Sequence, residues 1–135
     1  SDHQLLVLAS VIEKETGTAE DRPLIAGVFH NRLRLGMKMQ SDPTVIYGIS
    51  NFDGNLTRKH LETPTPFNTY TEMGLPPTPI SNPGWDSLHS ALQPASVKYL
   101  YFVARGDGSS AFSRTLREHQ RAVWKYQVQP HRNSR

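Results

Sequence analysis

The stretch ASVIEKETGT, residues 9–18, decides most of what can be inferred from this sequence. An apolar run carries directly into two glutamates, Glu13 and Glu15, and a glycine follows at position 17. Apolar side chains that recur every three or four residues are typical of a helix with one buried face. Because a glycine directly after such a run is a common helix stop, we expect a helix over residues 3–16.

The two glutamates point to different sides of this helix. At about 100° per residue, Glu15 lies about 55° from the mean direction of the apolar side chains, and Glu13 lies about 105° from it. Glu15 therefore continues the buried stripe, where burial raises the pKa of a carboxyl group by disfavouring its charged form. A general acid near neutral pH requires such a pKa, so Glu15 is the candidate catalytic residue. The alternative is that the last helical turn has emerged into solvent and that both carboxylates are merely solvated.

Length and composition describe one modest domain. The chain has 135 residues, 36% of them hydrophobic, and no apolar run approaches the ~18 residues of a membrane-spanning helix. It contains no cysteine, which excludes disulfides and thiolate zinc sites, and its six histidines do not form close pairs of ligand spacing. We therefore expect no metal and no other cofactor. The net charge is +3, but the basic residues are dispersed and nucleic-acid motifs are absent, so no nucleic-acid partner is expected.

The rest of the sequence predicts short helices, one hairpin and a long loop. Helices are expected from the Thr18–Asp21 capping box to Gly36, and over Asp42–Tyr47, Leu56–Leu61, Trp85–Leu92 and Thr115–Tyr126. Segments Tyr99–Val103 and Ala111–Ser113 predict the two strands of a β-hairpin. Residues 63–84 hold most of the ten prolines and predict an irregular but ordered loop. The prediction is an α+β, mostly helical single domain over residues 1–128, followed by a frayed basic tail over 129–135.

Six stretches occur in one order along the chain: ASVIEKET, VFHNRLRLGMKMQSDPTVIYG, LETPTPFNTY, GLPPTPISNPG, SLHSALQP and YLYFVA. Together they resemble the catalytic domain of the YceG-like family, the endolytic murein transglycosylases, from about Leu5 to about Tyr126. In that family the second glutamate of the E-K-E-T motif is catalytic, and this glutamate falls on Glu15. A glutamate followed by a hydroxyl residue at a helix end also resembles the catalytic helix of the lysozyme-like transglycosylases.

The resemblance implies a peptidoglycan lytic transglycosylase that cleaves the β-1,4 bond between N-acetylmuramic acid and N-acetylglucosamine inside glycan strands. It implies 1,6-anhydro-muramyl ends, with Glu15 acting first as acid and then as base. Two alternatives stay open: a muramidase-type hydrolase that uses water, and a glycan-binding module without activity. The resemblance also implies that the protein trims or terminates nascent strands beside peptidoglycan synthases. Its location would be the periplasmic face of the inner membrane, with a tether through a segment absent from this chain.

Polar groups in two segments are expected to contact the sugar. Gln40 and Ser41 stand in a Q-S-D-P-T stretch that resembles the family's pattern. Asn68, Thr69 and Tyr70 offer amide, hydroxyl and aromatic groups, which suit hydrogen bonding to a saccharide and stacking against it. The alternative for this second group is a loop that is packed down by its own side chains.

Further carboxylates and aromatic residues are given other roles. Asp42 precedes a proline and is interpreted as a cap of the next helix. Asp42 and Glu62 are nevertheless the candidates if a second carboxylate assists catalysis, since most glycosidases use a pair. The aromatic residues Tyr99, Tyr101 and Phe102 are expected in the core of the hairpin rather than in a cleft.

Overall fold

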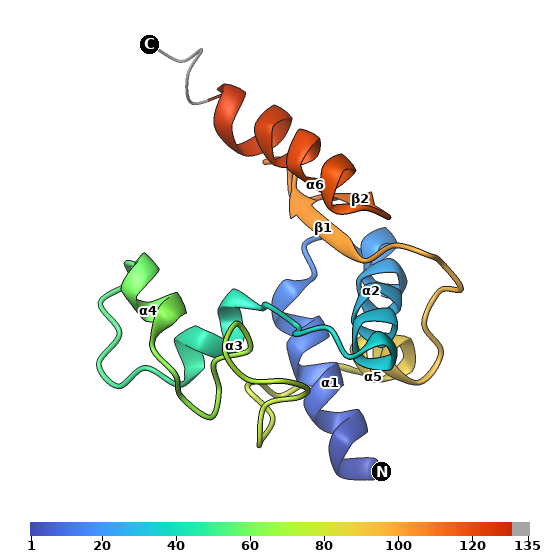
Figure 1. Cartoon of the computed structure of the whole chain (residues 1–135). Helices are drawn as coiled ribbons and strands as arrows, with labels where there is room; N and C mark the ends of the chain where they lie inside the picture. Colours follow the sequence, from blue (N-terminus) through green and yellow to red (C-terminus); the bar gives the residue numbers. More distant parts are fainter. Residues whose placement is uncertain (131–135) are drawn as a thin grey trace.

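The N-terminal apolar stretch forms a helix, and the remaining elements follow in the expected order in the computed structural model, which describes residues 1–130 (Figure 1). The elements are α1 (Asp2–Glu15), a 3₁₀ turn (Ala19–Asp21), α2 (Arg22–Leu35), α3 (Asp42–Tyr47), α4 (Arg58–Glu62), α5 (Trp85–Leu92), β1 (Tyr101–Ala104), β2 (Ser110–Ser113), α6 (Leu116–Val123) and a π-helical turn (Trp124–Val128). The predicted α+β class, mostly helical with one hairpin, is confirmed. Gln129 and Pro130 continue the last helix, and the rest of the tail predicted to fray lies outside the described residues.

Helices α1, α2 and α5 pack together and enclose the core. The residues buried on α1 form one continuous run, Val7–Ile12, and Phe29 of α2 is the largest fully buried side chain. Burying side chains of this size contributes about 1.5–3 kcal/mol each, so this three-helix body is the main source of stability. Gly27 of α2 lets the chain after α5 approach closely, because a Cβ there would lie 2.8 Å from the Ala95 carbonyl oxygen.

The proline-rich loop is held against α1 by one buried serine. The Ser10 hydroxyl donates to the carbonyl of Val7 at 2.6 Å and accepts from the backbone N–H of Ile80 at 3.0 Å. The Ser81 hydroxyl donates in turn to the carbonyl of Ser10 at 2.9 Å. These bonds satisfy backbone groups that proline-rich sequence cannot pair within itself, which explains how a segment without regular structure is ordered.

The hairpin and α6 stand above the helical body as a second unit (Figure 1). Strands β1 and β2 are antiparallel, with Tyr101 opposite Ser113 and Ala104 opposite Ser110, and α6 packs against both strands. We call β1, β2 and α6 the hairpin unit. Because two strands alone are marginally stable, the helix that covers them supplies most of the packing of this unit.

The expected capping box at residues 18–21 is wrong. Thr18 makes no capping hydrogen bond, and α2 begins only at Arg22, after the 3₁₀ turn. The carboxylate of Asp21 instead accepts from the backbone N–H of Ser110 at 2.8 Å. This side chain is used to attach the hairpin unit to the start of α2, and only the three-dimensional fold brings the two segments together.

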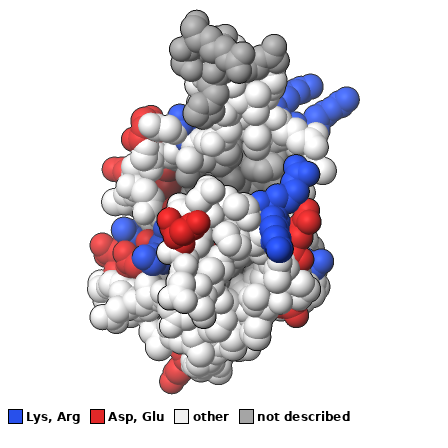
Figure 2. All heavy atoms as spheres, turned by 90° about the vertical axis from the view of Figure 1, so that its left-hand side faces the viewer, with Lys and Arg blue, Asp and Glu red and all other residues white. Residues whose placement is uncertain are grey.

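The surface of the face that carries α4 mixes both signs of charge. Figure 2 shows acidic and basic side chains interspersed over this face, with large uncharged areas between them. Among residues 1–130, no helix has the length and apolar character needed to cross a lipid bilayer.

Candidate active site

A cleft of about 750 Å³ lies between the helical body and the hairpin unit. One side is formed by the end of α1, by α2 and by the segment that leads into α3, with Tyr70 from the proline-rich loop. The other side is formed by β1 and by one face of α6, which carries Leu116, His119 and Val123. A second hollow of about 620 Å³ lies beside the start of α1, but none of the described residues that line it carries a side-chain carboxyl group. The first cleft therefore offers the acid that the sequence predicts.

Glu15 is the last residue of α1 and lines the cleft. The helix ends there because Thr16 adopts an extended conformation, and its N–H and hydroxyl both donate to the carbonyl of Ile12. The next residue, Gly17, allows the hairpin turn to approach, since a Cβ at this position would lie 2.0 Å from the Gly108 carbonyl oxygen. Thr16 therefore ends the helix, and Gly17 lets the hairpin turn lie directly beside that end.

The surroundings of Glu15 favour its protonated form. Burial, as the larger cause, and the negative charge of Asp42 together raise its pKa to about 7, and a hydrogen bond from Ser41 acts in the opposite direction. The Ser41 hydroxyl donates that bond to Oε1 of Glu15 across 3.4 Å, which is long for an O–H donor and therefore weak. The rise in pKa expected from the helix face is confirmed. The contribution of Asp42 was not foreseen from the sequence.

Glu13 has the opposite role, two residues earlier on the same helix. Its Oε1 accepts from the backbone N–H of Gly84 at 2.8 Å and from the Ser87 hydroxyl at 3.0 Å. These two bonds are the main causes of its lowered pKa, the Gly84 bond being the larger. Gly84 is the residue that precedes helix α5, so the carboxylate satisfies free donors at the start of that helix. Glu13 thus ties α1 to α5, and its ionised form suits a structural role.

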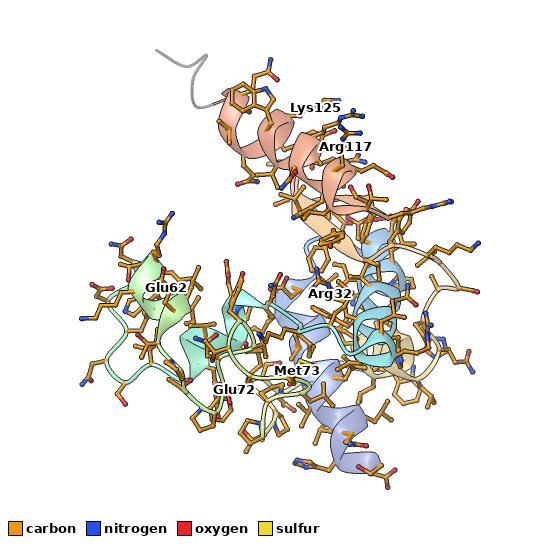
Figure 3. All side chains as sticks on the ribbon, in the orientation of Figure 1. Arg32, Glu62, Glu72, Met73, Arg117 and Lys125 are labelled. Carbon is orange, nitrogen blue, oxygen red and sulfur yellow. The ribbon has the colours of Figure 1, made fainter. Side chains whose placement is uncertain are left out.

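The interpretation of Asp42 as a helix cap is wrong. The capping position of α3 is Ser41, whose side chain makes no capping bond, and Asp42 is the first residue inside the helix. Its carboxylate lines the cleft and accepts a 2.6 Å hydrogen bond from the Tyr70 hydroxyl. The other candidate for a second carboxylate, Glu62, is exposed on α4, does not line the cleft and lies far from α1 (Figure 3). Asp42 is therefore the carboxylate that accompanies Glu15.

Two of the five residues expected to contact sugar line the cleft, namely Gln40 and Tyr70. Gln40 is exposed and has a φ of 52°, a left-handed conformation that is uncommon outside glycine. Burial of the ring, the hydrogen bond to Asp42 and nearby negative charge raise the pKa of Tyr70, so its hydroxyl stays protonated and donates. The Gln40 amide can therefore donate to a ligand in the cleft or accept from it, and the Tyr70 oxygen, whose proton goes to Asp42, can accept from it.

The other three residues, Ser41, Asn68 and Thr69, are almost fully buried behind the cleft wall. The Asn68 amide donates to the carbonyls of three residues, His60, Leu61 and Thr63. Its Oδ1 accepts from the N–H of Tyr70 at 2.9 Å. The Thr69 hydroxyl accepts from the N–H of Ser41 at 2.9 Å. These polar atoms are used to hold the loop and Glu15, as in the alternative of a loop packed by its own side chains.

The hairpin contributes aromatic residues to the cleft that were not foreseen. Tyr101 and Phe102 line the cleft, so their expected place in the hairpin core alone is wrong. The ring of Tyr101 is stacked on His119 of α6, with centroids 4.9 Å apart, whereas Phe102 also packs its edge on Phe29 in the core. Both side chains are only half-buried, which leaves part of each residue at the cleft. Tyr99 does not line the cleft and packs on Phe112, as expected.

The helical spacing of Leu116, His119 and Val123 is the signal that could have revealed the opposite wall. These residues lie at i, i+3 and i+7 and form one face of α6.

Among residues 1–130, no group of three histidine, aspartate or glutamate side chains is placed to hold a metal ion. The site is thus a carboxylic acid with one neighbouring carboxylate, set in a cleft with one aromatic wall.

Comparisons with known proteins found a family and several relatives that match most of this chain. The profile of the YceG-like family matches residues 1–125. An endolytic murein transglycosylase of Bacillus subtilis (strain 168) is 45% identical over 126 residues, and that of Streptococcus pneumoniae serotype 2 (strain D39 / NCTC 7466) is 35% identical over 127 residues. The crystal structure of a yceG-like protein from Listeria monocytogenes matches with a TM-score of 0.81 at 46% identity, covering 88% of this chain and 38% of that chain.

The two curated relatives are much longer than the part that matches. The alignments cover 93% and 90% of this chain, but only 35% and 23% of the relatives. The chain therefore spans between about a quarter and a third of the length of the curated relatives it matches.

Proposed function

The chain belongs to the YceG-like family, and from this membership and the cleft around Glu15 we propose that it is the catalytic part of an endolytic peptidoglycan lytic transglycosylase. The bond cleaved is the β-1,4 linkage from N-acetylmuramic acid to N-acetylglucosamine within a glycan strand. The observation that carries the proposal is a partly buried carboxyl group with a pKa of about 7 at the wall of a cleft. Such a group can give up a proton and take one back near neutral pH.

In the first step Glu15 acts as the general acid. Its proton goes to the glycosidic oxygen as the bond from that oxygen to muramyl C1 breaks, and the N-acetylglucosamine side leaves with a free hydroxyl. Positive charge develops at C1, and the acetamido group of the same sugar stabilises it, as in substrate-assisted glycosidases. The nearby charge of Asp42 also favours this state, because a carboxylate stabilises developing positive charge in a poorly solvated cleft.

In the second step Glu15 acts as the base. Its carboxylate takes the proton from the muramyl C6 hydroxyl, whose oxygen attacks C1 and closes the 1,6-anhydro ring. The acid is thereby regenerated and no water is consumed. One carboxyl group serves both steps, which fits a pKa close to the pH at which both protonation states are populated.

The neighbouring residues divide into two groups in this proposal. Gln40 and Tyr70 contact the sugar directly, because their side chains line the cleft. Ser41 and Thr69 position Glu15 and the loop from behind the wall, and Asn68 holds the backbone that presents Tyr70. No cofactor enters either step.

Peptidoglycan lies outside the cytoplasmic membrane, so the domain faces the periplasm or the cell wall. The full-length protein is tethered to the inner membrane and trims or terminates nascent strands beside the peptidoglycan synthases. Fractionation of cells that express the full-length protein tests the location, and recovery in the cytosolic fraction contradicts it. Crosslinking in growing cells tests the contact with synthases.

Mass spectrometry of glycan strands digested by the chain tests the reaction. A lytic transglycosylase gives anhydro-muramyl ends, which are lighter by one water molecule than the reducing ends that a muramidase-type hydrolase produces. A chain that binds strands but leaves the product profile unchanged is a glycan-binding module. Glu15→Gln serves as the inactive control, since it removes the acid but keeps the shape of the side chain.

A further inference from the structure

Arg32 places a positive charge in the wall of the cleft. The residue lies on α2 and is only 6% exposed. Its Nε donates to the carbonyl of Leu100 at 2.6 Å, and its Nη1 donates to the carbonyl of Lys38 at 2.6 Å. The guanidinium also lies over the Tyr101 ring, 4.9 Å from its centroid. Figure 3 shows Arg32 in the middle of the molecule, between the helical body and the hairpin unit.

Among residues 1–130, no carboxylate forms an ion pair with this cation. The one ion pair among the described residues joins Arg22 to Asp86, and both hydrogen-bond acceptors of Arg32 are neutral carbonyls. Nη2 donates to no described residue, and it does not belong to the buried polar atoms that lack a partner, so it is open to the cleft. Burying a charge is costly unless the charge is paired. The open donors of this cation can therefore bind an anion.

The rest of the cleft leaves Arg32 as the group that can bind an anion. Among the described lining residues it is the one lysine or arginine, and Glu15 and Asp42 are the carboxyl groups. Burial and the charge of Arg32 lower the pKa of His119 from its usual 6.5, so this imidazole is neutral near pH 7. A planar guanidinium matches the two oxygens of a carboxylate better than it matches single hydroxyl groups.

We propose that Arg32 binds a carboxylate carried on the C3 substituent of the muramyl residue and so distinguishes muramyl strands from polymers of N-acetylglucosamine alone. The inference rests on the proposed function, because it assumes a muramyl strand in this cleft. The carboxylate has two possible sources. In strands without peptides it is the lactyl group itself, and in peptide-bearing strands, where the lactyl group is an amide, it belongs to the stem peptide.

The guanidinium is prepared for this contact before substrate binds. The bonds to Leu100 and Lys38 and the contact with Tyr101 fix its plane, so little side-chain freedom is lost on binding. The same contacts give Arg32 a structural role, which a simple deletion would disturb. The test therefore begins with changes to the substrate rather than to the protein.

The first experiment uses the unmodified chain and four substrates: peptide-free strands, peptide-bearing strands, and each of these after carbodiimide amidation of the carboxylates with methylamine. We expect amidation to lower kcat/KM by about tenfold, the loss typical of a hydrogen bond to a charged group. A loss in peptide-free strands assigns the contact to the lactyl group. A loss confined to peptide-bearing strands assigns it to the stem. Equal rates before and after amidation of both kinds of strand overturn the proposal.

The second experiment compares Arg32→Lys with Arg34→Lys, which changes an exposed arginine on the same helix. Lysine keeps the charge but cannot present the planar pair of donors. We expect the effect of amidation to shrink several-fold in Arg32→Lys and to stay unchanged in Arg34→Lys. An effect of amidation that is unchanged in a folded Arg32→Lys protein means that another residue recognises the carboxylate.

A binding measurement serves if Arg32→Lys does not fold or if no strand is cleaved. The side-chain N–H resonance of Arg32 is followed by NMR while N-acetylmuramic acid or a muramyl peptide, each as the free acid or as its methyl ester, is added to the unmodified chain. We expect the free acid to shift this resonance and the ester to leave it in place. Identical responses overturn the proposal. Shifts specific to the acid, without anhydro ends in any digest, support the Arg32 contact while the proposed reaction fails.

Discussion

The hydroxyl of Tyr70 donates a 2.6 Å hydrogen bond to the carboxylate of Asp42. This bond joins the proline-rich loop to the start of α3, two segments that are 28 residues apart in the sequence. Asp42 is also the charge that helps to raise the pKa of Glu15. Tyr70 therefore acts on the acid indirectly, by holding a carboxylate that adds to the effect of burial on the pKa of Glu15.

The first prediction concerns this hydrogen bond. Tyr70→Phe keeps the ring but removes the donor, so Asp42 is no longer held and the sugar loses one contact. We expect kcat/KM for strand cleavage to fall by about tenfold, which corresponds to one hydrogen bond to a charged group. Tyr47→Phe is the matched control, because Tyr47 is 52% exposed and does not line the cleft. An equal loss of kcat/KM in the two variants would contradict the role assigned to Tyr70.

The second prediction concerns the pH dependence of cleavage. The alkaline limb of the rate profile should report the ionisation of Glu15 near pH 7. Asp42→Asn removes a negative charge beside Glu15, which stabilises the ionised form of the acid and lowers its pKa. We expect the limb to move to lower pH by roughly half a unit to one unit. Initial rates from pH 4 to 9 measure this shift.

Glu62→Gln provides the control for that experiment. It removes the same charge from an exposed carboxylate outside the cleft, so it should leave the limb in place. A limb that moves by the same amount in both variants would indicate a general effect of net charge. A limb that moves in neither would mean that burial alone determines the acidity of Glu15.

The third prediction separates the two glutamates of α1. Glu15→Gln removes the acid, and we expect cleavage to fall by at least about 10²-fold, the contribution typical of general acid catalysis. Glu13→Gln should keep most of the activity, because its carboxylate bonds Gly84 and Ser87 rather than substrate. It should lower the free energy of unfolding by about 1 kcal/mol, since the hydrogen bonds lose their charged acceptor. Strand-cleavage rates and urea unfolding measure both effects, and the reverse pattern of activity would refute the assignment.

The place of Glu15 on the buried face of α1 was predictable from sequence because it depends on local geometry. A helix repeats every 3.6 residues, so the spacing of Glu15 from Val11 and Ile12 already places the carboxyl group on the buried face. The helices, the hairpin and the ordered loop were likewise predicted from local patterns of apolar, glycine and proline residues. The bounds differ by a few residues, as at α4, where the cap is Thr57 and the helix begins at Arg58.

Apart from Tyr101 and Phe102, the errors concern polar side chains whose partners the local sequence pattern does not indicate. Asp21 and Asp42 both fit a helix cap locally, but their partners are Ser110 and Tyr70. Asn68 fits a sugar contact equally well, and only the folded path of the loop shows that its amide is occupied. A side chain of this kind has several partners of similar energy, and tertiary structure decides among them.

The fourth prediction tests the structural role of Asn68. The side chain is fully buried and makes four hydrogen bonds to backbone groups of its own loop and the end of α4. Asn68→Ala leaves these groups unpaired, and we expect a loss of about 2–4 kcal/mol in the free energy of unfolding. Asn55→Ala, at an exposed position, should change it by less than about 0.5 kcal/mol. Urea unfolding compares them, and a loss below about 1 kcal/mol for Asn68→Ala would contradict the assigned role.

The last prediction links the acid to the stability of the fold. Glu15 has a pKa of about 7 in the folded chain against 4.5 as the ordinary value, so the folded state binds its proton more tightly than the unfolded state. The stability that this tighter binding gives to the fold is fully present below about pH 4.5. It is lost as pH rises and is absent above pH 7. Glutamine does not titrate, so Glu15→Gln avoids the loss. We expect the free energy of unfolding of Glu15→Gln, relative to that of the wild type, to rise by on the order of 2–3 kcal/mol from pH 4.5 to pH 8. Urea unfolding of both proteins at several pH values measures the difference. A difference that stays constant with pH, or that favours the wild type more at high pH, would mean that Glu15 is not held as a buried acid.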